Sequence, residues 1–339
     1  MKALVYEGAW QMALREVEAP QPGPEDVIVA VKAVGVCGSD VHGYMGITGR
    51  RKPPMIMGHE FGGVVSAVGE RVTRATVGQK VVVQPLITCG QCANCRAGLP
   101  NICLNRTGLG MLDRDGAMAE AVRVPQQLLY AMPDDMEWDL SGMVEPLAVA
   151  LRAVNLTPLT LMGTVVIIGA GAIGLLTLLA AKLRGAGQVI ITDLSPHRLD
   201  LARQLGADVA VNVADEDPLA VVQAHTGGLG AQAVIEAVGI AASVKQSLAL
   251  VRTGGHITWI GNSQPEVAVN MQQVVTRELT IRGTYGFNEE FGRSLQAIHS
   301  GRIDVRPLIE RTAPLADGPQ LMHDLAKGTL DVAKVVLRP

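Results

Sequence analysis

The stretch Thr164-Val165-Val166-Ile167-Ile168-Gly169-Ala170-Gly171-Ala172-Ile173-Gly174 decides the fold of this chain. Its first five residues are apolar or β-branched, which favours a buried parallel strand, and a G-x-G-x-x-G turn follows and opens a helix. In such a turn the first glycine permits the bend, the second lets the backbone approach a pyrophosphate, and the third allows close packing of helix on strand. The N–H groups at the start of the helix attract phosphate oxygens. The stretch therefore predicts a dinucleotide-binding unit.

The strand that follows, residues 189–192, ends in Asp193, nineteen residues after Gly174. A carboxylate at that strand end accepts hydrogen bonds from ribose hydroxyls and repels a 2′-phosphate, so it favours NAD over NADP. The other interpretation of Asp193 is a helix cap before Leu194-Ser195-Pro196. Arg198 leaves three interpretations open: accommodation of a 2′-phosphate, packing on an adenine ring, or a solvent-facing position.

Strand and helix signals alternate around this unit, in residues 149–285, and predict a doubly wound parallel sheet of the Rossmann type. The six strands are expected at 164–168, 189–192, 209–211, 233–236, 256–260 and 279–282. Residues 1–148 instead contain short strands separated by Pro and Gly turns, which indicates a compact β-rich domain. Residues 286–339 return to mixed signals and are expected to rejoin that first domain. The fold class is α/β with two domains.

Composition narrows the functional classes. The chain has 339 residues, 18% charged, with a formal net charge of −3, which argues against a nucleic-acid or anionic-membrane partner. Residues 153–181 carry no charge over a length that could span a bilayer, but Pro158 and several glycines interrupt them, so no membrane span is expected. Glu7 comes too early for the apolar region of a signal peptide, and a cytoplasmic location is expected.

Four of the five cysteines are close together in the pattern C-x2-C-x2-C-x7-C, formed by Cys89, Cys92, Cys95 and Cys103. Four thiolates in one short loop close a tetrahedral Zn²⁺ shell without an open position, which is typical of a structural site. Disulfides fit a cytosolic chain poorly, and the spacings of ferredoxin clusters differ. The pattern predicts a structural zinc ion.

The fifth cysteine, Cys37, lies in Cys37-Gly38-Ser39-Asp40-Val41-His42, and His59-Glu60 lies in Gly58-His59-Glu60-Phe61-Gly62. Taken singly, Cys37 reads as a small buried hydrophobic residue, and Glu145 in Glu145-Pro146-Leu147 as a carboxylate at a helix start. Periodicity does not show that these residues meet in space.

The order and spacing of these elements, together with the four-cysteine loop and the later G-x-G-x-x-G, closely resemble the zinc-containing medium-chain dehydrogenases/reductases. The resemblance covers the whole chain and is strongest to the polyol (sorbitol/xylitol) and butanediol dehydrogenases, with threonine dehydrogenase close by. It implies a GroES-like catalytic domain (1–148 and 286–339), a Rossmann domain (149–285), and an active site in the cleft between them. It also implies a homotetramer or homodimer.

Matching positions imply a role for each site residue. Cys37 and His59 would hold a catalytic zinc ion, with Glu60 as a third, direct or exchangeable, ligand, and Glu145 would bind the metal directly or through its water. Ser39 would pass the proton of the alcohol towards the cofactor ribose, and His42 would relay it to solvent. The remaining cofactor contacts would be Ile173, Arg198, Ile260, Gly261 and Thr284, beside Gly169, Gly171, Gly174 and Asp193.

The resulting expectation is an NAD-dependent dehydrogenase with two zinc ions per chain. It would oxidise a secondary hydroxyl of a polyol, diol or sugar acid to a ketone. An alcohol is hardly ionised at neutral pH, and zinc as a Lewis acid lowers the pKa of a bound oxygen acid. The alternatives are a threonine 3-dehydrogenase, a sugar-phosphate (galactitol-phosphate-like) dehydrogenase, a zinc-free reductase of the same superfamily and, more remotely, a non-enzymatic nucleotide-binding protein. Threonine dehydrogenases often carry Asp at the position of Glu145, which tilts the choice towards a polyol or diol.

Two departures leave questions open. Where relatives commonly read Gly-Gly-Phe-Ala-Glu-Tyr, this chain has Gly116-Ala117-Met118-Ala119-Glu120-Ala121, so Met118 either reflects drift of the core or borders a wider substrate pocket. Arg50-Arg51-Lys52 either forms a solvated surface loop or supplies a cation that pairs with a carboxylate or phosphate of the substrate.

Overall fold

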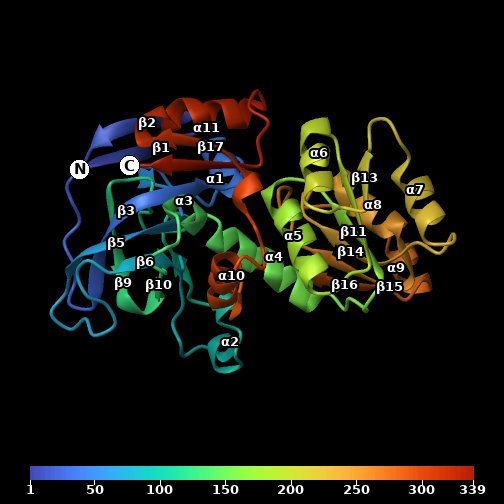
Figure 1. Cartoon of the computed structure of the whole chain (residues 1–339), viewed down its shortest axis with the longest axis horizontal. Coiled ribbons are helices and arrows are strands. Elements are labelled where there is room, and N and C mark those ends of the chain that lie inside the picture. Colours follow the sequence, from blue (N-terminus) through green and yellow to red (C-terminus); the bar gives the residue numbers. More distant parts are fainter. The chain divides into compact units, whose positions relative to one another are not determined.

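A computed structural model describes all residues, 1–339, and the chain forms two compact units. Unit 1 consists of Met1–Glu145 and Phe291–Pro339, and unit 2 of Pro146–Glu290. Figure 1 shows the elements of each unit, coloured along the sequence. No helix is both long and apolar enough to cross a membrane.

Unit 2 is built on a six-stranded sheet in the order β13-β12-β11-β14-β15-β16, in which every neighbouring pair is parallel. Its strands are β11 (Thr164–Ile168), β12 (Gln188–Asp193), β13 (Val209–Asn212), β14 (Ala231–Glu236), β15 (Val251–Trp259) and β16 (Thr280–Gly283). The strand order reverses between β11 and β14, which confirms the prediction of a doubly wound sheet. Ligands bind such sheets at the carboxyl ends of the strands beside this reversal.

Helices follow the strands of unit 2 in sequence: α5 (Ala172–Leu183), α6 (Pro196–Gln204), α7 (Pro218–His225), α8 (Ala241–Leu250) and α9 (Met271–Thr276). Helices α5 and α6 contact β11, β12 and β13, whereas α8 contacts β14, β15 and β11. The apolar segment that could span a bilayer by length is thus divided among the end of α4 (Val144–Leu156), the buried strand β11 and α5. Most of its hydrophobic side chains are buried in this unit, whereas Leu161 and Met162 are exposed.

Unit 1 contains a seven-stranded sheet in the order β10-β6-β5-β3-β18-β17, with β9 also paired to β3. These strands are β3 (Asp26–Val36), β5 (Glu60–Val68), β6 (Lys80–Val83), β9 (Ala121–Pro125), β10 (Leu129–Ala131), β17 (Ile309–Pro314) and β18 (Lys334–Arg338). Smaller sheets join β1 (Lys2–Gly8), β2 (Gln11–Glu16) and β4 (Met55–Ile56), and β7 (Leu86–Ile87) with β8 (Thr107–Gly108). Its helices are α1 (Gly38–Tyr44), α2 (Ala93–Arg96), α3 (Trp138–Ser141), α10 (Glu290–His299) and α11 (Gly318–Lys327).

The C-terminal segment completes this sheet, since β18 pairs antiparallel with β3, red beside blue in Figure 1. In the register Val335 is opposite Val36, and on the other side of β3 Gly35 is opposite Glu60 of β5. The carboxyl end of β3 and the amino ends of β5 and β18 therefore meet at one edge of the sheet. Residues just beyond these ends are brought together although they are far apart in sequence.

Met118 is fully buried and belongs to the hydrophobic core cluster of unit 1. A Cβ atom on Gly58 would come within 2.9 Å of the Met118 Cγ atom, so this side chain packs against the turn that precedes His59. The structure therefore favours the interpretation of Met118 as a core residue.

Candidate functional site

The short helix α1 fixes Cys37 at its start. Cys37 is the N-cap residue: its sulfur accepts a hydrogen bond from the Ser39 N–H (3.4 Å), and its own N–H donates to Asp40 Oδ2 (3.2 Å). The two bonds form a capping box, which sets the direction in which the chain enters the helix. The Cys37 sulfur thus lies beside the N-terminus of the helix.

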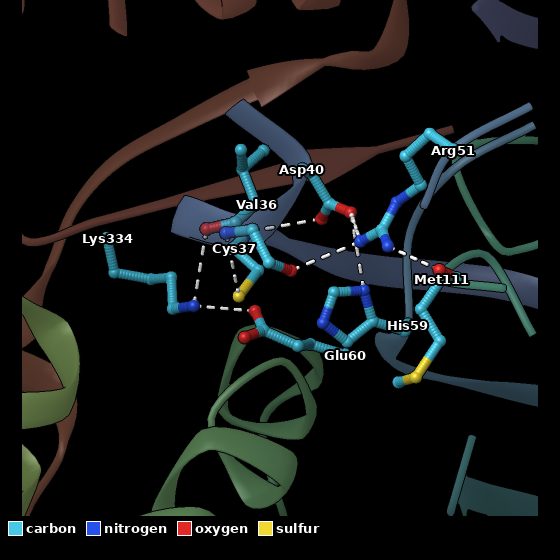
Figure 2. Close-up of polar contacts among 9 residues, drawn as sticks. Val36, Cys37, Asp40, Arg51, His59, Glu60, Met111 and Lys334 are labelled. Carbon is cyan, nitrogen blue, oxygen red and sulfur yellow. Dashed lines mark hydrogen bonds and ion pairs between the residues drawn. The ribbon is translucent and has the colours of Figure 1, made fainter. Parts of the chain in front are cut away.

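Cys37, His59 and Glu60 form a cluster in which one ligand atom from each residue lies within 4.8 Å of the others. Figure 2 shows their side chains directed towards one another at the edge where β3 ends and β5 begins. His59 and Glu60 are buried, and Glu60 Oε1 has no hydrogen-bond partner. A thiol, an imidazole and a buried carboxylate oxygen without a partner are a donor set that fits Zn²⁺.

The other oxygen of Glu60, Oε2, accepts a hydrogen bond from Lys334 Nζ (2.5 Å), and both side chains are only 1% exposed. Lys334 also donates to the carbonyl of Val36 (3.3 Å). Burial alone would lower the pKa of Lys334, but the nearby Glu60 and Cys37 raise it, so the ammonium stays charged. Glu60 is therefore divided in function, with one oxygen held by an internal cation and one free for a metal.

Asp40 supports the cluster from the opposite side. Its Oδ1 lies 3.4 Å from His59 Nδ1 and 2.9 Å from Arg51 Nη2. Burial would raise the pKa of Asp40, but His59 and Arg51 lower it to about 2. Burial would likewise lower the pKa of His59, but Asp40 and Cys37 raise it well above its usual value. A carboxylate on one ring nitrogen leaves the other nitrogen as the metal ligand.

Glu145 lies in the first turn of α4 and is 7% exposed. Burial, together with the charges of Glu60 and Asp40, raises its pKa to about 7, although His59 and Lys334 oppose the rise. Glu145 thus interacts with the cluster electrostatically, but it is not one of the residues whose ligand atoms lie within 4.8 Å of one another.

Ser39 and His42 lie one turn apart on α1, at a spacing that places side chains on the same face. The hydroxyl oxygen of Ser39 accepts a hydrogen bond from Arg51 Nη2 (3.1 Å). His42 is half-buried, and this burial lowers its pKa, so its ring is neutral near pH 7. A neutral imidazole is able to accept a proton.

The four-cysteine loop forms a second cluster, with all four sulfur atoms within 4.8 Å of one another. Cys103 Sγ lies 3.5 Å from Cys89 Sγ and 3.9 Å from Cys92 Sγ, and none of the cysteines forms a disulfide. Thiolates placed tetrahedrally about 2.3 Å from zinc are about 3.8 Å apart, so the loop fits the ion. Backbone N–H groups of Cys95 and Leu104 lower the pKa of Cys92 to about 6, whereas burial and the neighbouring thiols raise that of Cys95 to about 12.

In unit 2 the Gly-rich turn has the geometry that its sequence predicts. Gly169 has a φ of +97°, a left-handed conformation that glycine adopts without strain, and Gly171 is the N-cap of α5. A Cβ atom on Gly174 would overlap the carbonyl oxygen of Gly169. The helix start and the strand end are therefore packed as closely as a pyrophosphate-binding turn requires, with Ile173 in the first turn of α5.

Asp193 ends β12 beside this turn. Its Oδ2 accepts a hydrogen bond from the Ala170 N–H (2.6 Å), and its Oδ1 accepts from the N–H groups of Leu194 (2.8 Å) and Ser195 (2.9 Å). The helix cap of α6 is supplied by Ser195, which accepts from the Arg198 N–H (3.2 Å). Asp193 thus ties the Gly-rich turn to the end of the neighbouring strand. The guanidinium of Arg198 lies 3.9 Å from the place of a Cβ atom on Gly171.

The other predicted cofactor residues follow the next strands of the same sheet. Ile260 and Gly261 come directly after β15, and the N–H group of Thr284, after β16, donates to the Trp259 carbonyl (3.0 Å). A Cβ atom on Gly261 would overlap the backbone nitrogen of Gly239, so the chain after β14 lies against the chain after β15. All these residues are at the carboxyl edge of the parallel strands.

Sequence reasoning singled out neither Lys334 nor Glu236, and it treated Arg51 only as part of a basic loop that either faces solvent or binds an acidic substrate. Glu236 is fully buried at the end of β14, where its Oε1 accepts from the N–H groups of Val238 (2.8 Å) and Gly239 (2.7 Å). Lys334 and Glu236 are lone charges at the ends of apolar runs, a signal that could have marked both. Arg51 is buried, so the interpretation of its loop as fully solvated is wrong at this position, while Arg50 and Lys52 are exposed.

Comparisons with known proteins agree with this geometry. A family model described as "Alcohol dehydrogenase GroES-like domain" matches residues 23–134, and one described as "Zinc-binding dehydrogenase" matches residues 172–300. The sorbitol dehydrogenase of Bacillus subtilis is 31% identical, covering 100% of this chain and 97% of its own. The L-threonine 3-dehydrogenase of the same organism is 36% identical over 100% of this chain and 99% of its own length.

Solved structures match over the same length. A zinc-binding dehydrogenase of Sinorhizobium meliloti bound to NADP is 33% identical, with a TM-score of 0.92 and coverage of 100% of this chain and 99% of that one. An alcohol dehydrogenase of Escherichia coli complexed with NADH is 31% identical, with a TM-score of 0.90 and the same coverage.

Proposed function

Because the chain belongs to the zinc-containing medium-chain dehydrogenases/reductases, we propose that it oxidises a secondary hydroxyl of a polyol, diol or sugar acid to a ketone and transfers the hydride to NAD. The buried cluster of Cys37, His59 and Glu60 carries the proposal. A buried carboxylate oxygen without a partner is costly in a purely structural role, whereas a metal ion bound there together with the thiol and the imidazole would satisfy it.

The two clusters support a complement of two zinc ions per chain. Cys37 and His59 would hold the catalytic ion, with Glu60 as a direct or exchangeable ligand and Glu145 bound directly or through water. Cys89, Cys92, Cys95 and Cys103 would hold the structural ion. When bound at the first cluster, zinc supplies Lewis acidity that makes the hydroxyl of the substrate a stronger acid. A loop of reduced thiolates also suits the cytoplasm, where we place the protein.

The residues of α1 would move the proton. The Ser39 hydroxyl accepts the proton of the substrate and passes its own towards the cofactor ribose, and His42 takes it on to solvent. The lowered pKa of His42 supports this order, because a neutral ring is ready to receive the proton near pH 7. Removal of the proton leaves the electron pair that expels hydride towards the nicotinamide.

Asp193 supports NAD as the preferred cofactor. Its two oxygens already accept three backbone N–H groups, but an ionised carboxylate has about four acceptor positions, so capacity remains for ribose hydroxyls. The same negative charge repels a 2′-phosphate. Arg198 lies towards the Gly-rich turn, where it would counter the charge of the pyrophosphate. The related structure bound to NADP makes the cofactor a necessary part of the test.

A second copy of the chain is the expected protein partner, in a homodimer or homotetramer. Strand β16 is an edge strand of the six-stranded sheet, and most of its residues are exposed. Met271 and Val275 of α9 are large hydrophobic residues that are 75% and 66% exposed. An unpaired strand edge next to exposed hydrophobic side chains is typical of a surface that another chain covers.

The test is NAD⁺ reduction, followed as NADH absorbance, with a panel of polyols, diols, aldonates, sugar phosphates and threonine. We expect a polyol, diol or sugar acid to respond, NADP⁺ to be used poorly, and Cys37→Ser to abolish turnover and remove one zinc ion per chain. A response to threonine alone would move the assignment to a threonine dehydrogenase. If no substrate responds and Cys37→Ser keeps its full zinc content, the proposed activity is wrong.

A further inference from the structure

Arg51 is a buried arginine beside the proposed catalytic zinc site. Its side chain is only 4% exposed, and its partner Asp40 is fully buried. The stem crosses α1 at Gly43, where a Cβ atom would overlap the Arg51 Cγ atom. The helix thus leaves room for this one side chain, which the exposed Arg50 and Lys52 on either side do not need.

The guanidinium of Arg51 joins two segments to its own loop. Nη2 donates to Asp40 Oδ1 (2.9 Å) and Ser39 Oγ (3.1 Å), and Nη1 donates to the carbonyl of Met111. Figure 2 shows the guanidinium between Asp40 and the Met111 carbonyl. Because the guanidinium is planar and its donors have fixed directions, it fixes the orientation of its acceptors, which a flexible ammonium does not.

Through Asp40 this arrangement reaches two of the proposed metal ligands, Cys37 and His59. Asp40 Oδ1 is shared between Arg51 and His59 Nδ1 (3.4 Å), and Oδ2 accepts the Cys37 N–H (3.2 Å). A rotation of the carboxylate would therefore disturb the ring of one ligand and the backbone of the other. Outer carboxylates of this kind orient metal-binding histidines, and their loss typically costs 10–100-fold in metal affinity or activity.

Through Ser39 the same guanidinium reaches the proposed proton path. A hydroxyl has a single proton to donate, and the Ser39 oxygen is already an acceptor for Arg51. Arg51 has no acceptor atom, so the Ser39 O–H must point away from it. The hydrogen bond thus sets the direction of the Ser39 proton before a substrate binds.

We propose that Arg51 is a positioning residue that holds Asp40 and Ser39 in the orientations that the zinc site and the proton path require. The inference rests on the proposed function. It also argues against Arg51 as the cation that binds an acidic substrate, because its guanidinium is buried and both Nη atoms donate to internal acceptors. Acidic and neutral substrates should then respond alike to its substitution.

The test compares Arg51→Met, Arg51→Lys and, as a matched control, Arg74→Met, which removes an exposed arginine from the same unit. For Arg51→Met we expect kcat to fall 10–100-fold with the KM for NAD⁺ unchanged. We also expect one of two zinc ions to leave faster to a chelator by a similar factor. The kcat and the rate of zinc release of Arg51→Lys should lie between those of Arg51→Met and the unsubstituted protein. Both values in Arg74→Met should match the unsubstituted protein. Guanidinium ion added to Arg51→Ala should restore part of the activity, a response that a general loss of folding would not give.

An Arg51→Met protein with unchanged kcat and zinc release would overturn the inference, as would a loss of activity in Arg51→Ala that guanidinium does not reverse. Cys37→Ser separates this failure from failure of the proposed function. If Cys37→Ser lacks one zinc ion and is inactive while Arg51→Met behaves normally, only the role of Arg51 is wrong. If Cys37→Ser keeps both ions, the zinc site and the role of Arg51 fail together.

Discussion

Glu145 should make the metal-free protein less stable as pH rises, and Glu145→Gln should remove this dependence. The carboxyl group is buried, and burial with the neighbouring Glu60 and Asp40 raises its pKa from 4.5 to about 7. A glutamine keeps the shape and cannot ionise. The comparison therefore isolates one ionisation among the many that change with pH.

The direction of this pH dependence follows from the number of protons bound to Glu145 in the folded and unfolded chains. Between pH 4.5 and about 7 the folded chain keeps the Glu145 proton that the unfolded chain has lost, so the free energy of unfolding falls as pH rises. The contribution is complete below the unfolded pKa and is lost as pH rises through the folded one. At about 1.4 kcal/mol for each unit of pKa difference, the whole effect is about 3 kcal/mol. Roughly 2.5 kcal/mol of it falls between about pH 5 and 8.

The assay is urea unfolding of metal-free protein at pH 5 and 8. Trp10 and Trp138 lie in unit 1 and Trp259 in unit 2, so a Trp259→Phe background makes tryptophan fluorescence report on unit 1. The unsubstituted protein should lose about 2.5 kcal/mol more than Glu145→Gln over this range. Equal losses in the two proteins would refute the reasoning. Adding Zn²⁺ back should shrink the difference, because a bound cation favours the ionised carboxylate.

Three further predictions concern other parts of the two sites. Lys334→Met leaves the Glu60 carboxylate buried without its cation and should lower the free energy of unfolding in urea by about 3–5 kcal/mol. Lys334→Arg should be less affected, and an unchanged unfolding midpoint in Lys334→Met would contradict the ion pair. Gly174→Ala places a Cβ on the carbonyl oxygen of Gly169 and should weaken NAD⁺ binding in calorimetry at least about tenfold without loss of zinc, whereas normal affinity would speak against the Gly-rich turn as the cofactor site. Cys103→Ser should lose one zinc ion per chain in metal analysis and melt at a lower temperature, while a full zinc content would show that the loop does not hold the ion.

Local features of the fold could be predicted from the sequence because their physics is local. The G-x-G-x-x-G turn needs glycine for reasons of local backbone geometry. Gly169 has a positive φ, and Gly174 lies too close to the carbonyl of Gly169 for a side chain. Four thiols within fifteen residues are forced near one another by chain length alone. The six parallel strands followed from the alternation of strand and helix signals, and the structure moves their ends by only a few residues, most at the start of β15.

The proposed catalytic site could be predicted only through the resemblance. Cys37 and His59 are 22 residues apart, and Lys334 reaches the Val36 carbonyl across 298 residues, because β18 pairs with β3. No hydrophobic period specifies which strand a C-terminal segment will join. The burial of Arg51 could not be predicted either, since runs of charged residues usually face water. The Arg51 side chain is buried because Gly43 leaves room for it, which is a feature of the folded chain.

The charges of the site form a pattern that a list of metal ligands does not reveal. Asp40 is paired with Arg51, and Glu60 with Lys334, so two buried carboxylates are neutralised by cations from other parts of the chain. Zn²⁺ binds the deprotonated forms of its ligands, so Cys37 and His59 would be a thiolate and a neutral ring when the ion is bound. With Zn²⁺ bound there and Glu145 protonated, the site carries about one net positive charge, which favours the ionised form of one substrate hydroxyl. Ionisation of Glu145 would cancel that charge, so the protonation state of this carboxyl group would set how strongly the site draws a proton from its substrate.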